Sequence, residues 1–175
     1  MTAESGDLWV FGYGSLMWRP GFDCEERQLA TLHGFHRALC VLSHHHRGTP
    51  DQPGVVLGLD RGGSCRGIAF RVAKAKGDDT IAYLRAREQV TMVYRETQHR
   101  VRLADGRVVD ALAYTVDRRH KQYAACLDRP DLLRLVQQGI GVSGANPDYV
   151  RATHQHLGEL GLRDATLAWL VENLV

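Results

Sequence analysis

The spacing of hydrophobic residues predicts β-strands over most of the first two thirds of the chain. In the segment "RVVDALAYTVD", Leu112, Tyr114 and Val116 alternate with small or polar residues, which is the period of a half-buried strand. Other runs rich in apolar and β-branched residues are bounded by glycine or polar clusters, as strands usually are. We therefore expect strands at 8–13, 32–43, 54–60, 64–72, 99–103 and 107–117.

Two glycine-containing segments predict tight turns between neighbouring strands. Asp105-Gly106 is a preferred sequence for a two-residue hairpin turn, because glycine adopts positive φ angles at little cost. Arg61-Gly62-Gly63 is expected to join the two strands that flank it in the same way. The sequence thus predicts two hairpins.

Helix-start signals precede the remaining periodic segments. Asp78 and Asp79 can cap a helix over "TIAYLRAREQV", a segment rich in good helix formers. Asn146 is expected to cap another helix with Pro147 in its first turn, and Gly161 is expected to end that helix. The helices of the last third are expected at 129–140, 146–161 and 163–174.

Strands followed by helices favour an α+β fold. We expect a small, barrel-like, mostly antiparallel sheet flanked by helices. The 175 residues are enough for one hydrophobic core, and we find no repeat, linker or low-complexity segment that divides them. The sequence therefore predicts a single domain over residues 1–175.

Composition and charge change this picture little. The chain has a net charge of +2 and 44% hydrophobic residues, so we expect no nucleic acid or membrane partner. We find neither a secretory signal in "MTAESGDLWV" nor an apolar run long enough to span a bilayer. The cysteines form no CxxC pair and no zinc-site spacing, which favours reduced thiols and a cytoplasmic protein. They are Cys24, Cys40, Cys65 and Cys126.

One acidic residue continues an apolar helix face. Ile81 and Leu84 are three residues apart and Glu88 follows four later, so all three lie on one side of the expected helix. A carboxyl group on that side points into the interior or a cavity, where burial raises its pKa toward values useful for proton transfer. Alternatively, Glu88 is a structural acid paired with Arg85 or Arg87. The residues alone leave both interpretations open.

The segment "VFGYGSLMWRP" ends the first expected strand with two glycines and a serine. Gly12 and Gly14 would leave backbone N–H groups accessible to a ligand, and such groups suit an anion or an oxyanion. A tight turn explains the same glycines without any ligand. Ser15 has the hydroxyl of a nucleophile, but no G-x-S-x-G motif surrounds it, so a role in structuring the loop is favoured.

Two further motifs do not carry the function that they suggest. The segment "GIGVSG" (139–144) fits the dinucleotide-binding pattern G-x-G-x-x-G, but it follows a helical segment rather than a strand. The histidines of "HHH" (44–46) are adjacent, so they cannot all face one metal ion from an extended chain. We expect a solvated loop there, in which Arg47 can reach a carboxylate.

Taken together, these segments resemble the ChaC family of γ-glutamylcyclotransferases over nearly the whole chain. "VFGYGSLMW" is similar to the opening strand and Gly-Tyr-Gly-Ser-Leu loop of the family, and "AYLRARE" to the helix that ends in its catalytic glutamate. "HRGTPDQPG", "GGSCRGIAFRV" and "GVSGANPDYV" resemble three further family segments. One departure is "QVTMVY" in place of the Gly-Gly-Tyr found after the glutamate in some branches, which leaves the role of Tyr94 open.

The resemblance implies the γ-glutamylcyclotransferase-like fold and an enzyme that cleaves glutathione, a small-molecule substrate, to 5-oxoproline and cysteinylglycine. It maps the catalytic glutamate to Glu88 and places a tyrosine near the active site at Tyr149. Tyr149 also lies in the first turn of its expected helix, where free N–H groups favour a carboxylate. We expect no cofactor and no metal. The implied substrate-binding residues are Gly12, Tyr13, Gly14, Ser15, Leu16, Met17 and Tyr149.

Three different functions are also compatible with these residues. A related enzyme would act on γ-glutamyl amines or γ-glutamyl amino acids other than glutathione through the same γ-glutamyl pocket. A non-catalytic binding or regulatory module would use the fold without turnover, although a binder has no evident use for a lone acid on an apolar face. A serine hydrolase would use Ser15 as its nucleophile.

Overall fold

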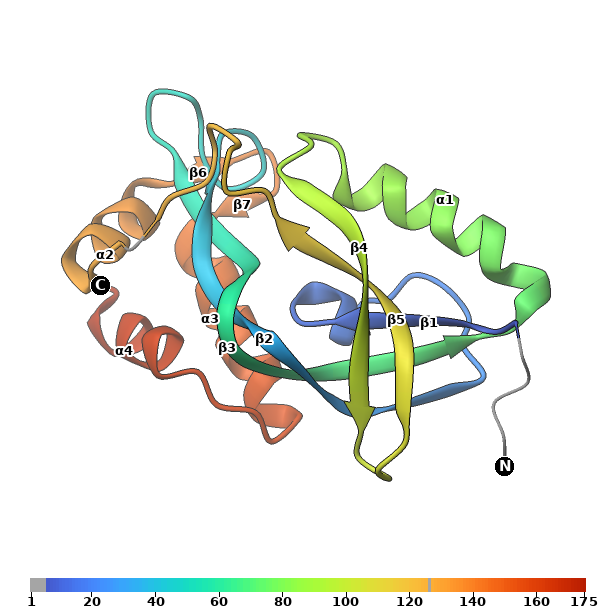
Figure 1. Ribbon diagram of the computed structural model, residues 1–175. Helices are drawn as coiled ribbons and strands as arrows, with labels where there is room; N and C mark the ends of the chain where they lie inside the picture. Colours follow the sequence, from blue (N-terminus) through green and yellow to red (C-terminus); the bar gives the residue numbers. More distant parts are fainter. Residues whose placement is uncertain (1–5, 126) are drawn as a thin grey trace. The chain divides into compact units, whose positions relative to one another are not determined.

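The computed structural model describes residues 6–125 and 127–175 (Figure 1). Within them the chain forms two compact units, and the long strands β2 (Glu26–Ser43) and β3 (Gly54–Val72) contribute to both. A single domain over residues 1–175 stays a prediction. The first unit comprises Met1–Arg37 and Leu59–Asp117, and the second comprises Ala38–Gly58 and Arg118–Val175.

The first unit is built on a closed barrel with the strand order β1-β3-β2-β4-β5. Pairing is antiparallel between β1 and β3, β2 and β4, and β4 and β5. Strands β1 and β5 run parallel, with Trp9 opposite Ala111, and Figure 1 shows the blue β1 beside the yellow β5. The expected α+β fold with a barrel-like, mostly antiparallel sheet is confirmed. The remaining barrel strands are β1 (Leu8–Gly12), β4 (Tyr94–Leu103) and β5 (Val108–Val116).

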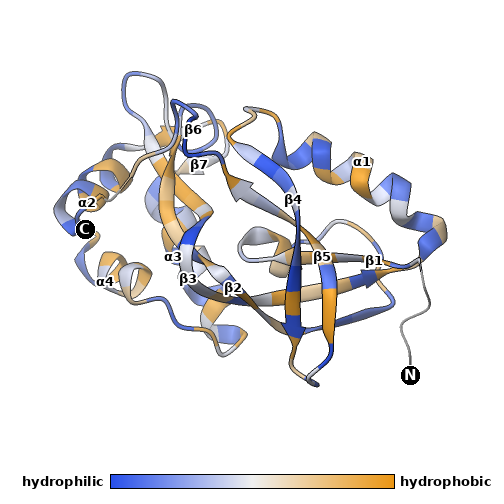
Figure 2. Cartoon of the chain, viewed as in Figure 1, coloured by the Kyte–Doolittle hydropathy of each residue, from blue (hydrophilic) through white to orange (hydrophobic). Residues whose placement is uncertain are grey.

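Helix α1 (Gly77–Glu88) packs on this unit through a narrow buried stripe. Leu84 is fully buried, and Figure 2 shows hydrophobic and hydrophilic patches alternating along the helix. Aromatic edges link α1 to the barrel, because the ring of Phe22 lies 5.5 Å from that of Phe70 in β3 and 6.5 Å from that of Tyr83 in α1, measured between centroids. These contacts fix the direction of α1 and hence the position of its last residue, Glu88.

One of the two expected hairpins is present. Gly106 has a φ of +94° in the turn that joins β4 to β5, so the Asp105-Gly106 hairpin is confirmed. The hairpin expected at Arg61-Gly62-Gly63 is wrong, because β3 runs through this segment without a break. The two glycines have φ values of +103° and +67°. They therefore allow the backbone to deviate locally from regular strand geometry, and the strand continues beyond them.

Element boundaries differ from the expected ones where the residues are polar. Strands β2 and β4 begin earlier than expected, at Glu26 and Tyr94, because their half-exposed polar ends give no hydrophobic signal. Helix α1 begins at Gly77, so Asp78 and Asp79 do not cap it but lie in its first turn. Acidic residues are still favourable there, since they face the positive end of the helix dipole.

The second unit contains helices whose apolar sides form its core. Buried residues of these helices include Leu135, Val150 and Leu170. Asp128 and Asp164 cap the first and the last of them through side-chain bonds to backbone N–H groups. No helix among the described residues has the length and apolar character that crossing a membrane requires. The elements are α2 (Arg129–Gln138), β6 (Ile140–Gly141), β7 (Gly144–Ala145), α3 (Asn146–Glu159) and α4 (Ala165–Asn173).

Asn146 is not the cap that its position suggests. It is the first residue of α3 and is fully buried, and Ala145 occupies the N-cap position. Its side-chain amide donates to the carbonyl of Val55 at 2.9 Å and accepts from the N–H of Val55 at 2.8 Å. Buried backbone N–H and C=O groups need hydrogen-bond partners, and the Asn146 side chain serves those of Val55 instead of capping the helix. The end of α3 is as expected, since Gly161 follows it with a φ of +72°.

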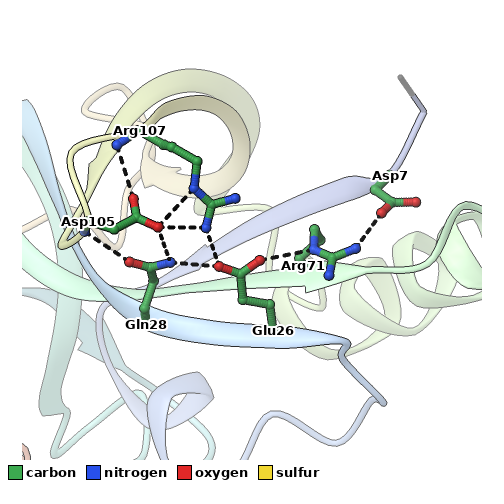
Figure 3. A network of polar contacts seen from close by, with 6 residues as sticks. All are labelled: Asp7, Glu26, Gln28, Arg71, Asp105 and Arg107. Carbon is green, nitrogen blue, oxygen red and sulfur yellow. Dashed lines mark hydrogen bonds and ion pairs between the residues drawn. The ribbon is translucent and has the colours of Figure 1, made fainter. Parts of the chain in front are cut away.

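A network of partly exposed charged side chains ties the elements of the first unit together (Figure 3). Glu26 of β2 is at its centre and forms ion pairs with Arg107 and with Arg71, whose Nε lies 3.1 Å from Oε2. Arg71 also binds Asp7 at 2.8 Å, before β1, and Arg107 binds Asp105 at 2.8 Å in the β4–β5 turn. The residue before β1, two strands and a hairpin turn are therefore linked through two arginines.

The network makes stability depend on pH. Burial works to raise the pKa of Glu26, but hydrogen bonds from Arg107 and Arg71 outweigh it and lower that pKa. Hydrogen bonds from Arg107 lower the pKa of Asp105 to about 2. A carboxyl group with a lowered pKa stabilises the fold above its unfolded-state pKa of about 4, and this contribution is lost as the pH falls through the folded-state pKa.

We expect Arg107→Met to lower the melting temperature by a few degrees at pH 7, because it leaves Glu26 and Asp105 without their shared cation. The difference from the wild-type protein should shrink as the pH falls through about 2, because Asp105 of the folded wild-type protein becomes protonated there. Thermal unfolding across this pH range tests it, with Arg163→Met at an exposed position as the control. An unchanged melting temperature at pH 7 would show that the network contributes nothing.

Candidate active site

The loop after β1 folds into a single 3₁₀ turn, η1 (Ser15–Met17). The N–H of Met17 donates to the carbonyl of Gly14 at 2.9 Å, and the N–H of Arg19 to that of Ser15 at 2.8 Å. Gly12 packs closely against the turn, because a Cβ atom there would lie 3.1 Å from the Cβ of Leu16, which is tighter than most such contacts. A role of the Gly12 backbone in substrate binding stays a prediction, and the turn after it brings Leu16 close to the end of β1.

The expected substrate residues of this loop differ in how much surface they offer. Ser15 is exposed and Gly14 is partly exposed. Met17 is completely buried and its N–H is bonded within the turn, so its side chain supports the loop from the core, and a contact of Met17 with substrate stays a prediction. By geometry, the first N–H groups of a 3₁₀ turn have no partner inside the turn. The buried members are Gly12, Tyr13, Leu16 and Met17.

Two arginines from β2 hold carbonyl groups of the loop. Arg37 donates from Nε to the carbonyl of Tyr13 at 2.6 Å, and Arg27 donates from Nη2 to that of Met17 at 3.1 Å. The C=O and N–H of a trans peptide point in opposite directions. Binding of the Tyr13 carbonyl by Arg37 therefore turns the N–H of Gly14, which belongs to the same peptide group, away from that arginine.

Glu88 is the last residue of α1 and lies one turn beyond the fully buried Leu84. Its side chain is only 18% exposed. Burial raises the pKa of this carboxyl, and the nearby charge of Arg87 partly opposes the shift. The negative end of the helix dipole acts in the same direction as burial. The carboxyl group thus has the environment expected of a proton-transfer group.

The ion-pair alternative for Glu88 is only partly realised. Arg85 does not serve as the partner, since it binds both carboxylate oxygens of Glu96 at 2.9 Å. The Nε of Arg87 lies 3.5 Å from Oε1 of Glu88, and Nη2 of the same side chain donates to the Ser15 hydroxyl at 2.9 Å. The loop and the end of α1 therefore share one arginine, which brings the predicted acid and the predicted loop together within the first unit.

A second acid lies near Glu88 on the barrel. The Tyr114 hydroxyl donates to Oε2 of Glu96 at 3.0 Å, and the pKa of Tyr114 is raised by burial, by this bond and by the negative charges of Glu96 and Glu88. Hydrogen bonds from Arg85 lower the pKa of Glu96. The pKa values of the two acids are thus shifted in opposite directions, and Glu88 is the one whose protonated form is easier to reach.

Tyr149 and Arg47 lie together in the second unit. The Tyr149 hydroxyl accepts a hydrogen bond from the N–H of Leu57 at 3.0 Å, and its ring lies under the Arg47 guanidinium, 5.6 Å from the centroid. Arg47 also donates to the carbonyl of Ala145 at 3.2 Å. Tyr149 is in the first turn of α3, as expected. These contacts show that Tyr149 and Arg47 both have structural roles. Any contact of Tyr149 with substrate stays a proposal.

The two rejected motifs form one local structure in the second unit. "GIGVSG" makes the β6–β7 hairpin after α2 rather than a strand-to-helix turn. Its Val142 and Ser143 donate backbone hydrogen bonds of 2.9 Å to the carbonyls of His45 and His46. Among the residues that the structure describes, no three His, Cys, Asp or Glu side chains are grouped so as to hold a metal ion. Cys126 lies outside the described residues.

One protein-family model matches the sequence of this chain. A family model described as ChaC-like protein matches residues 8–175. The chain belongs to the ChaC-like family. The resemblance seen in the sequence is thereby confirmed over nearly the whole chain.

Proteins similar to this chain carry consistent names. The glutathione-specific γ-glutamylcyclotransferase of Escherichia coli (strain K12) is 36% identical over 161 residues, which cover 92% of this chain and 70% of that protein. Gamma-glutamylcyclotransferase 2-3 of Arabidopsis thaliana is 29% identical over 168 residues, covering 90% and 83%. A solved glutathione-specific γ-glutamyl cyclotransferase from yeast superposes with a TM-score of 0.84 at 21% identity, over 96% of this chain and 95% of that one. This last likeness establishes the fold.

In this ChaC-like chain, sequence reasoning misses the arginines that hold the loop. Arg27 and Arg37 lie far from the loop along the chain, and an arginine on a strand carries no signal that it reaches a distant carbonyl. The sequence suggests Arg87 only as an ion-pair partner of Glu88 and not as a ligand of Ser15. These contacts depend on the closed barrel, so only the structure reveals them.

We expect Gly12→Ala to lower the free energy of unfolding by about 1–3 kcal/mol, because the added methyl group overpacks the contact with Leu16. Chemical denaturation measures this loss. The control is Gly158→Ala in the last turn of α3, where an added Cβ meets nothing within 4 Å, so this variant should be at least as stable as the wild-type protein. Equal stability of both variants would show that the close approach at Gly12 is not required.

Proposed function

We propose that this protein is a γ-glutamylcyclotransferase that cleaves glutathione to 5-oxoproline and cysteinylglycine, with Glu88 as the acid and base. The observation that carries the proposal is the pairing of a largely buried carboxyl at the end of α1 with the Gly-Tyr-Gly-Ser-Leu loop through Arg87. Membership of the ChaC-like family and the name of the Escherichia coli relative support the choice of substrate. We further propose that the enzyme works in the cytoplasm, where glutathione is plentiful.

The substrate supplies its own nucleophile. The α-amino nitrogen of the γ-glutamyl group attacks the γ-amide carbonyl carbon and closes a five-membered ring, while the bond from this carbon to the cysteine nitrogen breaks. No water enters the products. An intramolecular attack already has favourable proximity, so the enzyme needs no serine or cysteine nucleophile.

Glu88 handles the protons of this reaction. The attacking nitrogen must lose a proton as the new bond forms, and the leaving amine must gain one before it departs. A single carboxylate can take the first proton and return it to the leaving nitrogen. The raised pKa of Glu88, caused by burial, makes the protonated form easier to reach after it has acted as a base.

The backbone of the loop stabilises the negative charge that develops on the carbonyl oxygen. Donors between Tyr13 and Leu16 are the candidates, because the N–H of Met17 is already bonded to Gly14. The N–H of Gly14 is oriented by the bond from Arg37 to the preceding carbonyl. Preorganised N–H groups of this kind are worth several kcal/mol in a transition state, about 3–4 in a measured case.

The serine hydrolase function is disfavoured by the partner of the Ser15 hydroxyl. That oxygen accepts from Arg87, and a guanidinium cannot remove a proton from it. Two other functions differ from the proposed one in ways that an assay can measure. A cyclotransferase for a different γ-glutamyl compound would turn over that compound instead of glutathione, and a non-catalytic binding module would turn over neither. Incubating the purified protein with glutathione, with γ-glutamyl peptides and with γ-glutamyl amines, and measuring 5-oxoproline, separates them. Release of 5-oxoproline from glutathione supports the proposal, and its absence with every substrate would favour a binding module.

We expect Glu88→Gln to lower kcat by about 10²–10⁴-fold, because the amide cannot transfer the proton. The variant should not melt below the wild-type protein at pH 7. Burial raises the pKa of Glu88, so the ionised carboxylate weakens the fold as the pH rises through that pKa, and the neutral amide removes this cost.

Glu172→Gln at an exposed position of α4 is the matched control and should keep full activity. The kinetics of both variants are compared at several pH values. A folded Glu88→Gln variant with wild-type turnover would contradict the mechanism.

We expect Tyr149→Phe to raise KM, because we propose that its hydroxyl contacts the substrate carboxylate as well as the N–H of Leu57. Losing a neutral hydrogen bond costs about 0.5–1.5 kcal/mol, and a bond to a charged group costs more. Steady-state kinetics and thermal unfolding are measured together. A lower melting temperature with unchanged KM would confine Tyr149 to its structural role.

A further inference from the structure

We propose that Arg87 is the positioning residue of this site and holds the Gly-Tyr-Gly-Ser-Leu loop and the Glu88 carboxylate in one fixed geometry. The inference rests on the proposed function for its kinetic consequences, but its structural part stands on the contacts of Arg87 alone. Arg87 itself need not touch the substrate, since it acts through Ser15, the backbone of the loop and Glu88.

Arg87 contacts the loop on several sides at once. Its Nη2 donates to the Ser15 hydroxyl at 2.9 Å, at the start of the loop's 3₁₀ turn. Its Nη1 donates to the carbonyl of Arg19 at 2.5 Å and lies 3.2 Å from the carbonyl of Pro20, after that turn. One planar group therefore binds both ends of the segment that follows the glycines. Its third nitrogen, Nε, lies 3.5 Å from Oε1 of Glu88.

The contact with Ser15 sets the direction of the serine proton. A hydroxyl group has one proton and two lone pairs, and Arg87 can only donate. The Ser15 oxygen must therefore use a lone pair toward Arg87, so its own proton points elsewhere. Because Ser15 is exposed, that proton is available to a bound ligand. Arg87 thus makes Ser15 a hydrogen-bond donor rather than a nucleophile.

The contact between Arg87 and Glu88 affects how readily the Glu88 carboxyl ionises. The groups near Glu88 are Arg87 and Arg85 on α1 and Tyr114 on β5. The Tyr114 hydroxyl is in turn hydrogen-bonded to Glu96 on β4. Arg85 is held by Glu96, so its charge is largely compensated. Arg87 is the cation that favours the ionised form of Glu88 against the effect of burial. A side chain without charge at this position should leave the carboxyl harder to ionise.

Lysine cannot replace both functions of Arg87. An ammonium group carries the same charge but is a compact point donor, whereas the guanidinium is a planar group with five N–H donors. Arg87→Lys should therefore keep much of the electrostatic effect on Glu88 while losing the simultaneous hold on Ser15 and Arg19. Arg87→Met should lose both. The two substitutions separate the charge of Arg87 from its geometry.

The experiment compares Arg87→Met and Arg87→Lys with Arg102→Met, which removes an exposed arginine from β4 of the same unit. The first readout is the pKa of the Glu88 carboxyl, measured by carbon-13 NMR without substrate. We expect it to rise by about one unit in Arg87→Met, the size of effect that a neighbouring cation produces, and to stay near the wild-type value in Arg87→Lys. Arg102→Met should leave it unchanged.

The second readout is hydrogen exchange of the loop N–H groups that are bonded within the turn, those of Met17 and Arg19. Both Arg87 variants should exchange them about tenfold faster or more, because a charge-assisted hydrogen bond to the loop is lost. The third readout is kinetics with glutathione. Arg87→Lys should mainly raise KM, and Arg87→Met should also lower kcat and move its acidic limb to higher pH.

Wild-type values of the Glu88 pKa and of loop exchange in a folded Arg87→Met variant would overturn the positioning role. These two measurements need no substrate, so they decide the inference even if the wild-type protein releases no 5-oxoproline. In that case the proposed function fails separately. The expected NMR and exchange effects together with unchanged kinetics would also contradict the role, since a loop and an acid that matter for turnover cannot be disturbed without consequence.

Discussion

The parallel pairing of β1 with β5 is the constraint on which the candidate site depends. It closes the barrel and fixes the point where β1 ends at Gly12. The loop can turn back there because Gly12 has no side chain to meet Leu16. Helix α1 packs on the same barrel through Leu84, so its last residue reaches the same region. The position of the acid and the position of the loop are thus both consequences of one closed sheet.

The chemistry of the site comes from a balance of opposing electrostatic effects. Burial and the end of a helix make the Glu88 carboxylate harder to ionise, and Arg87 makes it easier. A group that must first accept and then donate a proton works best when neither form is strongly preferred near the working pH. Arg37 has a related effect, because the Tyr13 carbonyl that it binds belongs to the peptide group that carries the N–H of Gly14 and so orients that N–H.

The sequence predicts those features that have a local signal. The alternation around Tyr114, the Asp105-Gly106 turn and the placing of Glu88 beyond Leu84 all agree with the structure. The prediction fails where one residue type is compatible with two structures. Glycine at position 62 is expected to make a hairpin turn, but its positive φ instead allows an irregular stretch within the continuous strand β3. Contacts such as that between Arg87 and Ser15 join residues far apart in the chain, and no periodicity records them.

The central claim is that the substrate supplies its own nucleophile while Glu88 only moves protons. The most direct test is to run the reaction with glutathione in water enriched in oxygen-18 and to weigh the product by mass spectrometry. Intramolecular attack predicts 5-oxoproline whose oxygen atoms all come from glutathione, with no label incorporated during turnover. Hydrolysis through an enzyme-bound acyl group would instead release glutamate carrying one labelled oxygen, and that result would contradict the account.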